Sequence, residues 1–401
     1  MATFEPTSGI ASSDRILVVG ASLAGSKCVE RLRELGHSGD ILVVDCDPHA
    51  PYDRPQLSKQ FLMEGAQLEG ARWWPGDCDL IRARAELLDV KGRSIEISVG
   101  PDNRRRLTAD AILVATGAVP RRLAVEPDGT IAIRSADDAL RLRDAVDAGA
   151  RHALVIGAGS LGTEISSSLR SRDVEVSIVD SAPVPLGRLL GKQMGTKAIK
   201  WMQEWGVKLH LGEAIESIEK HHDGLLAELT SGIVVECDIV VSAVGAVPQV
   251  DWLRDSGLAI DDGVRCAESG AVLDIRGTPV PGIFAAGDVA SVQQSDGSFL
   301  RQESWTSAMN LGANAADVMY GRARTINGPE KPYFWTDQFG RKIQVYGRPT
   351  YDGELVCEKP LPIRNGGLFR LTEAGETKAW IGINAQAALA QVMTQEVVQD
   401  T

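Results

Sequence analysis

The sequence lacks a long hydrophobic run and a signal peptide. No apolar stretch in the 401 residues approaches the roughly 20 residues that a membrane helix needs. Residues 1–13 have neither the basic start nor the apolar core of a signal peptide, and are expected to form a flexible leader. These absences predict a cytoplasmic protein that has no membrane partner.

Paired cysteines and clustered basic residues are also missing. The six cysteines are scattered, without a C-x-x-C pair or metal-ligand spacing, which predicts reduced thiols and no metal site. Aromatic residues make up only 5%, and the formal net charge is -12. This charge disfavours nucleic acid as a partner, because a phosphate backbone requires clustered Lys and Arg. The basic run Arg104–Arg106 is expected at a solvated hairpin tip.

What the sequence does contain is a repeated alternation of strands and helices. Short runs of Val, Ile and Leu, bounded by Gly or Asp, predict buried parallel strands. They are Ile16–Gly20, Ile41–Asp45, Ala111–Thr116, Ala153–Gly157, Val176–Asp180, Ile239–Val244 and Ile283–Gly287. Helical patterns such as Ser26–Leu35 and Glu164–Ser171 lie between them, as in a doubly wound α/β sheet.

Residues 151–180 repeat the plan of residues 15–45, so two Rossmann-like dinucleotide-binding domains are predicted. A discontinuous domain would comprise 14–119 and 245–325, and a second domain 120–244. The period of two in 94–107 and 225–235 predicts β hairpins. After Gly328-Pro329, alternating strands precede a helical segment, 385–398, which predicts a small α+β C-terminal domain, 326–401. Residues 331–401 hold 8 Lys+Arg and 8 Asp+Glu, so the whole negative surplus falls on 1–330.

The first glycine motif is Gly20-Ala21-Ser22-Leu23-Ala24-Gly25, which follows a strand and opens a helix. It matches G-x-G-x-x-G, except that Ser22 occupies the middle glycine position. Such a turn directs backbone N–H groups and the helix N-terminus toward a pyrophosphate. Asp45 ends the next strand, where an acidic residue accepts hydrogen bonds from an adenosine ribose. Taken alone, this motif also fits a strand–helix turn without a ligand.

The second motif, Gly157–Gly162, is complete, and Asp180 closes its next strand. Asp180 would bond the ribose 2′-OH and repel a 2′-phosphate, which predicts NADH rather than NADPH, although Arg188 opposes this preference. Two further strand ends, Ala115-Thr116-Gly117 and Ala286-Gly287-Asp288, carry small residues that allow close approach of a ligand. Asp288 would bind the ribityl or pyrophosphate part of a flavin nucleotide.

Three further segments resemble one family. Pro51–Lys59 reads PYDRPQLSK and is similar to a signature of the FAD-dependent ferredoxin reductases that serve Rieske oxygenases and bacterial haem monooxygenases. Pro332–Gln338, PYFWTDQ, and Glu303-Ser304-Trp305 resemble two other segments of that family. The resemblance covers about residues 15–385.

This resemblance implies a glutathione-reductase-like fold with non-covalent FAD in the first domain and NADH in the second. Hydride would pass from NADH to FAD, and single electrons would then pass to a [2Fe–2S] ferredoxin that feeds an oxygenase. The ferredoxin would bind transiently near the C-terminal domain, and the reductase would be a monomer or weak dimer.

The resemblance also implies site residues. Contacts to FAD are implied for Ser22, Ala24, Asp45, Lys59, Ala85, Arg134, Asp288 and Trp305. Contacts to NADH are implied for Gly157, Gly159, Gly162, Glu164 and Asp180. Neighbouring motif positions are assigned to cofactor binding with them: Gly20, Leu23, Gly25, Arg54, Pro55, Ala115, Thr116, Gly117, Ser160, Leu161, Gly245, Gly287, Glu303, Ser304 and Trp335.

Catalytic roles are implied for Lys59, Glu164 and Trp335. Lys59 would lie beside the flavin ring and pair with Glu164 near the nicotinamide, whereas Trp335 would form an aromatic platform at the flavin edge. Without a catalytic role, Lys59 would be a surface lysine, Glu164 an ordinary helix glutamate and Trp335 a packed indole. The stretch from Phe61 to Arg84 is shorter than the family pattern, which weakens the assignment of Ala85.

The sequence is also compatible with two other functions. A flavin disulfide reductase or NADH oxidase has the same architecture, but requires a redox cysteine beside the flavin. Residues 58–62, SKQFL, contain none. A flavoprotein that resembles the apoptosis-inducing factors would instead bind NADH as a signal, and the sequence leaves this alternative standing.

Overall fold

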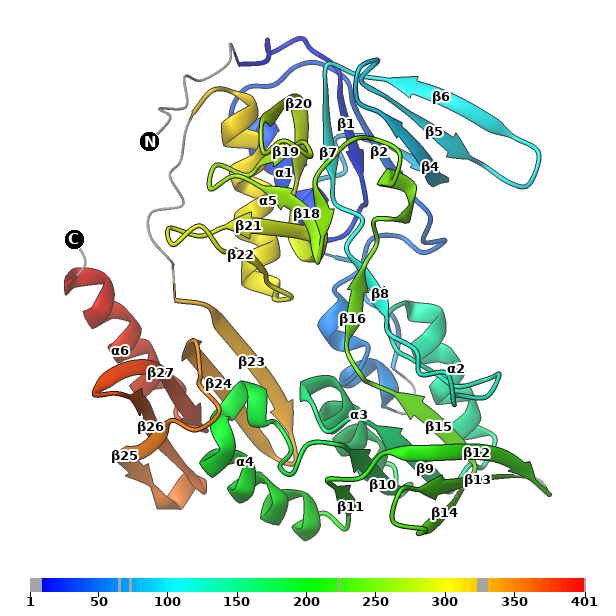
Figure 1. The fold of residues 1–401 in the computed structure, drawn as a ribbon, viewed down its shortest axis with the longest axis vertical. Helices are drawn as coiled ribbons and strands as arrows, with labels where there is room; N and C mark the ends of the chain where they lie inside the picture. Colours follow the sequence, from blue (N-terminus) through cyan, green and yellow to red (C-terminus); the bar gives the residue numbers. More distant parts are fainter. Residues whose placement is uncertain (1–8, 64–65, 72–73, 223, 323–330, 400–401) are drawn as a thin grey trace. The chain divides into compact units, whose positions relative to one another are not determined.

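The computed structural model describes residues 9–63, 66–71, 74–222, 224–322 and 331–399. The chain forms two compact units (Figure 1). Unit 1 comprises Met1–Asp53, Glu69–Val119 and Ala246–Glu330, and unit 2 comprises Arg54–Leu68, Pro120–Gly245 and Lys331–Thr401. The expected boundary at Gly328-Pro329 and most of the expected leader lie outside the described residues. No described helix combines the length and the apolar character needed to cross a membrane.

Unit 1 is built on a parallel sheet whose two middle strands are buried over their whole length. These strands run in the order β20-β7-β1-β2 and correspond to the runs predicted from the sequence. Their bounds are β1 (Ile16–Val19), β2 (Ile41–Asp45), β7 (Ala111–Val114) and β20 (Pro279–Ala285). The sheet continues through β3 (Asp79–Arg82), β17 (Ile260–Asp261), β18 (Gly263–Cys266), β19 (Ala271–Leu273), β21 (Ala290–Gln293) and β22 (Phe299–Arg301).

Two helices of unit 1, α1 (Leu23–Glu34) and α5 (Trp305–Met319), pack closely against each other. Gly312 permits this approach, because a Cβ at that position would lie 2.2 Å from the Ala24 carbonyl oxygen. The Arg31 guanidinium adds an ion pair, donating from Nε and Nη2 to Asp317 Oδ1 at 2.9 and 2.8 Å. The packing places the start of α1 beside the middle of α5.

A three-stranded antiparallel sheet in unit 1 confirms the first predicted hairpin. Its strands are β4 (Arg84–Asp89), β5 (Ser94–Ser98) and β6 (Arg104–Thr108). The expectation for Arg104–Arg106 was partly wrong, because these exposed arginines lie in β6 and pair with β5 rather than forming the tip. The turn between β5 and β6 consists of residues 99–103.

Unit 2 repeats the Rossmann-like plan. Four parallel strands run in the order β11-β10-β9-β15, as the sequence predicts for the last three. Their bounds are β9 (His152–Ile156), β10 (Glu175–Asp180), β11 (Lys208–Leu211) and β15 (Ile239–Ser242). The helices are α2 (Ala136–Asp147), α3 (Ser160–Arg170) and α4 (Gly187–Glu204), and the predicted hairpin consists of β12 (Ile215–His221), β13 (Gly224–Leu229) and β14 (Val234–Cys237). Short strands β8 (Ala118–Pro120) and β16 (Ala246–Pro248) pair where the chain changes units.

The C-terminal segment of unit 2 is an antiparallel sheet with one helix, as predicted. The strand order is β23-β24-β27-β26-β25, and the helix contacts β24 and β27. The bounds are β23 (Tyr333–Gln338), β24 (Arg341–Gly347), β25 (Glu354–Leu361), β26 (Gly366–Glu373), β27 (Glu376–Ile383) and α6 (Gln386–Gln399).

This sheet is attached to α4. The rings of Phe339 and Trp205 meet edge to face with centroids 5.9 Å apart, and the Arg341 guanidinium lies 4.9 Å from the Trp201 ring centroid. Arg341 also donates to Glu204 at 3.2 Å. These contacts explain why the sheet belongs to the same compact unit as the second Rossmann-like half. The expected division into three domains stays a prediction.

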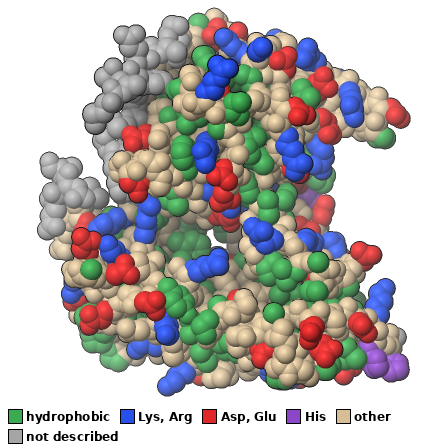
Figure 2. Space-filling view, in the orientation of Figure 1, with side chains coloured by type: hydrophobic (Ala, Val, Ile, Leu, Met, Phe, Trp, Pro, Cys, Tyr) green, Lys and Arg blue, Asp and Glu red, His purple; other side chains and the backbone are tan. Residues whose placement is uncertain are grey.

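The surface carries mixed charge. Figure 2 shows acidic and basic side chains interspersed over the visible face. Exposed ion pairs such as Lys208–Glu175, at 2.9 Å, account for part of this alternation. The net charge of -12 is therefore not gathered into one patch on that face.

Candidate functional site

The first glycine turn joins β1 to α1 in unit 1. Gly20 has φ +115, and a Cβ there would lie 2.2 Å from the Ala115 carbonyl oxygen. A Cβ on Gly25 would lie 2.0 Å from the Gly20 carbonyl oxygen. Both positions therefore require glycine. Ser22 is the N-cap of α1, with φ -78 and ψ -170, so the helix N-terminus opens directly after the strand.

The other predicted strand ends of unit 1 meet at the same edge of the sheet, because β1, β7 and β20 are parallel. Gly287 has φ +77, and a Cβ on it would lie 3.0 Å from the Ala24 Cβ. Thr116 donates its hydroxyl to the Gln249 carbonyl oxygen at 2.9 Å. Asp288 lies in the short turn Gly287–Val289, beside this edge. The structure thus brings together the three motifs that the sequence assigned to FAD.

The segment Glu303-Ser304-Trp305 begins α5. Ser304 accepts a hydrogen bond from the Ser307 N–H at 3.1 Å, and the Trp305 indole donates to Asp53 Oδ1 at 3.0 Å. Glu303 pairs with Arg301 at 2.5 Å. Ala85 packs against the hydrophobic core of unit 1 from β4.

The second glycine turn, in unit 2, has almost the same geometry. Gly157 has φ +105, and its Cβ would lie 2.5 Å from the Ala243 carbonyl oxygen. A Cβ on Gly162 would lie 2.0 Å from the Gly157 carbonyl oxygen. Gly159 is the N-cap of α3, with φ -75 and ψ -176, close to the angles of Ser22.

Gly159 differs from its two neighbouring glycines because its Cβ would meet nothing within 4 Å. Open space thus faces the backbone at the N-terminus of α3, where Ser160 and Leu161 form the first turn. Backbone N–H groups and a helix N-terminus beside open space fit a dinucleotide pyrophosphate. Gly245, with φ +102, follows β15 at the same edge.

Asp45 and Asp180 have a role that was not predicted from the sequence. The Asp180 carboxylate accepts from the Ala158 N–H at 2.6 Å and from the Ala182 N–H at 2.7 Å. The Asp45 carboxylate accepts in the same way from the Ala21 N–H at 2.5 Å and from the Asp47 N–H at 2.7 Å. Each carboxylate therefore braces its glycine turn. Each oxygen has a second lone pair, so a ribose hydroxyl still fits as a further donor.

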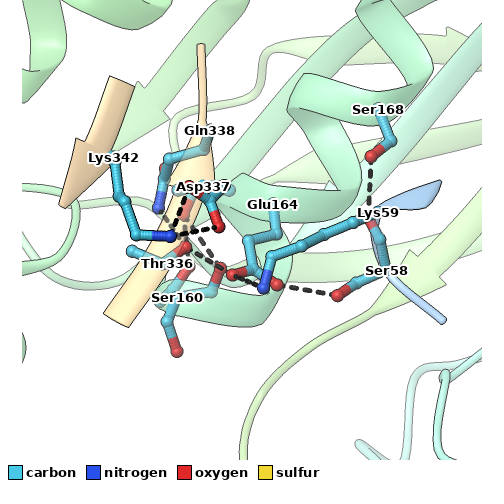
Figure 3. A network of polar contacts seen from close by, with 11 residues as sticks. Ser58, Lys59, Ser160, Glu164, Ser168, Thr336, Asp337, Gln338 and Lys342 are labelled. Atoms are coloured by element: carbon cyan, nitrogen blue, oxygen red, sulfur yellow. Dashed lines mark hydrogen bonds and ion pairs between the residues drawn. The ribbon is translucent and has the colours of Figure 1, made fainter. Parts of the chain in front are cut away.

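A buried ion pair lies within a network of polar contacts in unit 2 (Figure 3). Lys59 Nζ lies 3.0 Å from Glu164 Oε1, and the two side chains are only 12% and 8% exposed. Glu164 lies on α3, two residues after the last glycine of the second motif. Lys59 comes from residues 54–68, which pack in unit 2, although the sequence assigned them to the first domain. The predicted pairing of Lys59 with Glu164 is present in the structure.

Hydroxyl groups surround this carboxylate. Ser58 Oγ donates to Glu164 Oε2 at 2.7 Å, and the Thr336 hydroxyl donates to Oε1. Sequence reasoning missed Ser58 and Thr336 as site residues. The available signal was the polar spacing Glu164, Ser167, Ser168, which places one carboxylate and two hydroxyls on one face of a predicted helix.

Arg54 and Arg134 also lie in unit 2. Arg54 Nη1 donates to the Arg134 carbonyl oxygen, so the two assigned residues are neighbours. Pro55 lies in the same short helical turn as Arg54. Trp335 on β23 stacks on Tyr333, with ring centroids 5.9 Å apart and planes at 23°.

All six cysteines are free. Burial raises the pKa of Cys28, Cys237 and Cys266 to about 12, and that of Cys78 to about 11. The pKa of Cys46 is raised by burial and by the adjacent Asp45 carboxylate. These five thiols thus stay protonated near neutral pH, whereas thiol relay chemistry needs thiolate. Among the described residues, no group of three His, Cys, Asp or Glu converges as metal ligands would.

Comparison with known proteins gives matches over most of the chain. The pyridine nucleotide-disulphide oxidoreductase family model matches residues 14–312. The ferredoxin reductase component of chlorobenzene dioxygenase from Cupriavidus sp. (strain PS12) is 30% identical over 92% of this chain and 89% of that protein. Human apoptosis-inducing factor 3 is 31% identical over 85% of this chain, but the match spans only 56% of that relative's length.

A solved structure of a ferredoxin reductase also matches most of the chain. The ferredoxin reductase for the CYP199A2 system from Rhodopseudomonas palustris aligns with a TM-score of 0.85 and 26% identity. The alignment covers 94% of this chain and 93% of that structure. The fold class predicted from the sequence, with two Rossmann-like units, is confirmed.

Proposed function

Because the chain belongs to the pyridine nucleotide-disulphide oxidoreductase family, we propose that it is an FAD-dependent NADH:ferredoxin oxidoreductase. The family implies FAD and a nicotinamide dinucleotide as cofactors. When bound, these cofactors supply hydride transfer from NADH to FAD and release of electrons one at a time. The protein's own residues bind, orient and charge-balance the two cofactors.

The Lys59–Glu164 pair is the observation that carries this proposal. A buried ammonium requires a partner, and Glu164 supplies one at 3.0 Å directly after the glycine turn assigned to NADH. A fixed positive charge of this kind stabilises negative charge that develops on a nearby group. The segment that carries Lys59, residues 58–62, reads SKQFL and contains no cysteine for a thiol relay.

NADH is proposed over NADPH because of Asp180. Asp180 is the last residue of β10, and its carboxylate accepts a hydrogen bond from the Ala158 N–H in the second glycine turn. A carboxylate at this place would repel a 2′-phosphate. FAD is proposed for unit 1, where the strand ends carrying Ser22, Thr116 and Asp288 share one edge of the sheet.

The proposed electron acceptor is a [2Fe–2S] ferredoxin that docks transiently near the C-terminal sheet and feeds an oxygenase. Relatives named as ferredoxin reductase components support this acceptor, as does the balanced charge of residues 331–401. A net charge near zero is less repulsive to an acidic partner than the rest of the chain. A cytoplasmic location and a monomer or weak dimer complete the proposal.

A binding flavoprotein is the second candidate, favoured by the 31% identity to human apoptosis-inducing factor 3. In that case NADH would act as a ligand that changes association with other proteins. The two functions differ in turnover, because a reductase passes its electrons on and a sensor retains them.

An anaerobic stopped-flow experiment tests the proposal. The purified yellow protein is mixed with NADH, and then with a [2Fe–2S] ferredoxin and cytochrome c as final acceptor. We expect rapid bleaching of the flavin and cytochrome reduction that depends on the ferredoxin. Slow bleaching, or a long-lived reduced complex that ferredoxin does not discharge, would contradict the reductase and favour the binding protein.

A further inference from the structure

We propose that Thr336 and Ser58 are positioning residues that fix the Glu164 carboxylate, so that it holds the Lys59 ammonium in a single orientation. The inference rests on the proposed function for its catalytic consequence. Its structural basis lies entirely within unit 2 and involves residues from α3, β23 and the segment 54–68.

The carboxylate is held on both oxygens. Ser58 donates to Oε2, whereas Thr336 and Lys59 both reach Oε1. Because a carboxylate bonded by one cation alone can still rotate about its final bond, an additional donor on each side restricts it to one plane. These contacts fix which Glu164 oxygen faces Lys59.

The direction of the Thr336 hydroxyl is itself determined. Gln338 Nε2 donates to Thr336 Oγ1 at 3.0 Å. An ionised carboxylate can only accept, so the Thr336 proton must point to Glu164, and Gln338 must present its amide N–H rather than its oxygen. The hydrogen bonds thus run in one direction, from Gln338 through Thr336 to Glu164.

The two segments that supply these hydroxyls are anchored to the same helix face. Ser168 Oγ donates to the Ser58 carbonyl oxygen at 2.7 Å, and the Phe339 N–H donates to Ser167 Oγ at 2.7 Å. Ser167 and Ser168 follow Glu164 by three and four residues, which places all three on one face of α3. Thr336 is 0% exposed and Ser58 is 3% exposed, so water does not replace these donors.

Side-chain alternation along β23 gives the arrangement a second consequence. Thr336 and Trp335 point to opposite faces of the strand, so the bonds of Thr336 and Phe339 to α3 also set the position of the face that carries Trp335. Helix α3 thus holds both the lysine segment and the tryptophan strand.

The test compares Thr336→Val, which keeps the shape but removes the hydroxyl, with Thr336→Ser, which restores it. Thr377→Val, at a partly exposed position in β27 of the same sheet, is the control for the loss of a threonine hydroxyl from this sheet. The purified holoprotein is reduced by NADH under anaerobic conditions. We expect the maximal bleaching rate of Thr336→Val to fall about tenfold with little change in KM for NADH, since one charge-assisted hydrogen bond is lost. Thr336→Ser and Thr377→Val should remain close to the parent.

A double-mutant cycle with Lys59→Met separates positioning from simple loss of stability. Unfolding midpoints in denaturant are measured for the parent, both single variants and the double variant. If Thr336 acts through the ion pair, its substitution shifts the midpoint much less once Lys59 is absent. Full additivity, or an effect of Thr336→Val equal to that of Thr377→Val, would overturn the inference.

The same set of variants also covers two cases, in which Thr336→Val does not fold or NADH does not reduce the parent. If Thr336→Val does not fold, Ser58→Ala removes the donor to the other oxygen and must show the same coupling to Lys59. If the parent is not bleached by NADH, the proposed function fails, and the unfolding cycle still decides whether Thr336 and Ser58 act through the Glu164–Lys59 pair.

Discussion

At the scale of single residues, the glycines of the second turn divide into two kinds. Gly157 and Gly162 allow the backbone to pack on itself, whereas Gly159 leaves open space at the start of α3. The consensus motif alone does not separate these roles, because all three positions read as glycine. The structure separates them through what an added Cβ would contact.

The glycine roles give a matched prediction. Gly162→Ala should destabilise the fold by about 1–3 kcal/mol or more, because its Cβ would lie 2.0 Å from a backbone oxygen. Gly159→Ala should fold normally, since its φ of -75 is open to alanine. It should nevertheless raise the KM for NADH about tenfold, equivalent to roughly 1.4 kcal/mol. Denaturant unfolding and steady-state kinetics measure the two effects, and an unchanged KM would remove Gly159 from the NADH site.

Asp180 braces its turn and has a proposed role in cofactor binding, and a single substitution does not separate the two. Asp180→Ala removes the brace on Ala158 and Ala182 together with the proposed ribose acceptor. Asp180→Asn keeps an oxygen acceptor and loses the charge. We therefore expect Asp180→Ala to be less stable than Asp180→Asn.

Cofactor preference is tested in the same series. Asp180→Asn combined with Ser181→Arg should raise the ratio of kcat/KM for NADPH to that for NADH by about tenfold or more, because the repulsion of a 2′-phosphate is replaced by attraction. Asp45→Asn, in the equivalent brace of unit 1, is the control and should leave the ratio unchanged. A ratio that does not move in the combined variant would show that Asp180 does not select the cofactor.

At the scale of elements, α3 is the organising helix of the candidate site. Its apolar residues enter the core of unit 2, and its polar face holds the segments that supply Lys59 and Trp335. Buried polar groups on a helix require partners, and here those partners come from parts of the chain more than a hundred residues away. This explains why the segment 54–68 belongs to unit 2, although the residues before and after it in the sequence belong to unit 1.

A serine pair on α3 tests this role. Ser168→Ala leaves the Ser58 carbonyl oxygen without its hydroxyl donor, and should lower the free energy of unfolding by about 1–2 kcal/mol. Ser171→Ala removes only a hydroxyl that bonds back to the Ser167 carbonyl of its own helix, and should cost less. Hydrogen exchange should show faster opening of 58–62 in the first variant alone. Equal costs and equal exchange in both variants would contradict the anchoring of this segment by Ser168.

At the scale of the whole molecule, the cysteines distinguish two reaction classes that share this architecture. Only Cys46 and Cys357 are exposed, and burial keeps the pKa of Cys28, Cys78, Cys237 and Cys266 high. A raised pKa means that these four thiols stay neutral until the solution is strongly alkaline. Electron transfer is therefore expected to proceed without a thiol relay.

The prediction that follows concerns the exposed pair. The double variant with Cys46→Ser and Cys357→Ser should retain NADH-driven reduction of ferredoxin within about twofold, since surface substitutions of this kind have small effects. The parent at pH 8 should react with a thiol reagent fastest at Cys357, more slowly at Cys46, whose pKa is raised, and slowest at the four less accessible cysteines, as mass spectrometry of the labelled protein would show. Loss of electron transfer in the double variant would revive the disulfide reductase alternative.

The sequence by itself determined the parallel strands, both glycine turns, the acidic strand ends and the antiparallel C-terminal sheet. Each of these follows from local periodicity or from a motif within about thirty residues, which is the length of a βαβ unit. Only the tertiary structure decided that Ser58 and Thr336 share one carboxylate, that Asp45 and Asp180 brace their turns, and that Arg104–Arg106 lie within a strand. These features depend on which distant segments pack together, and packing is selected by the burial of whole faces rather than by any local pattern of residues.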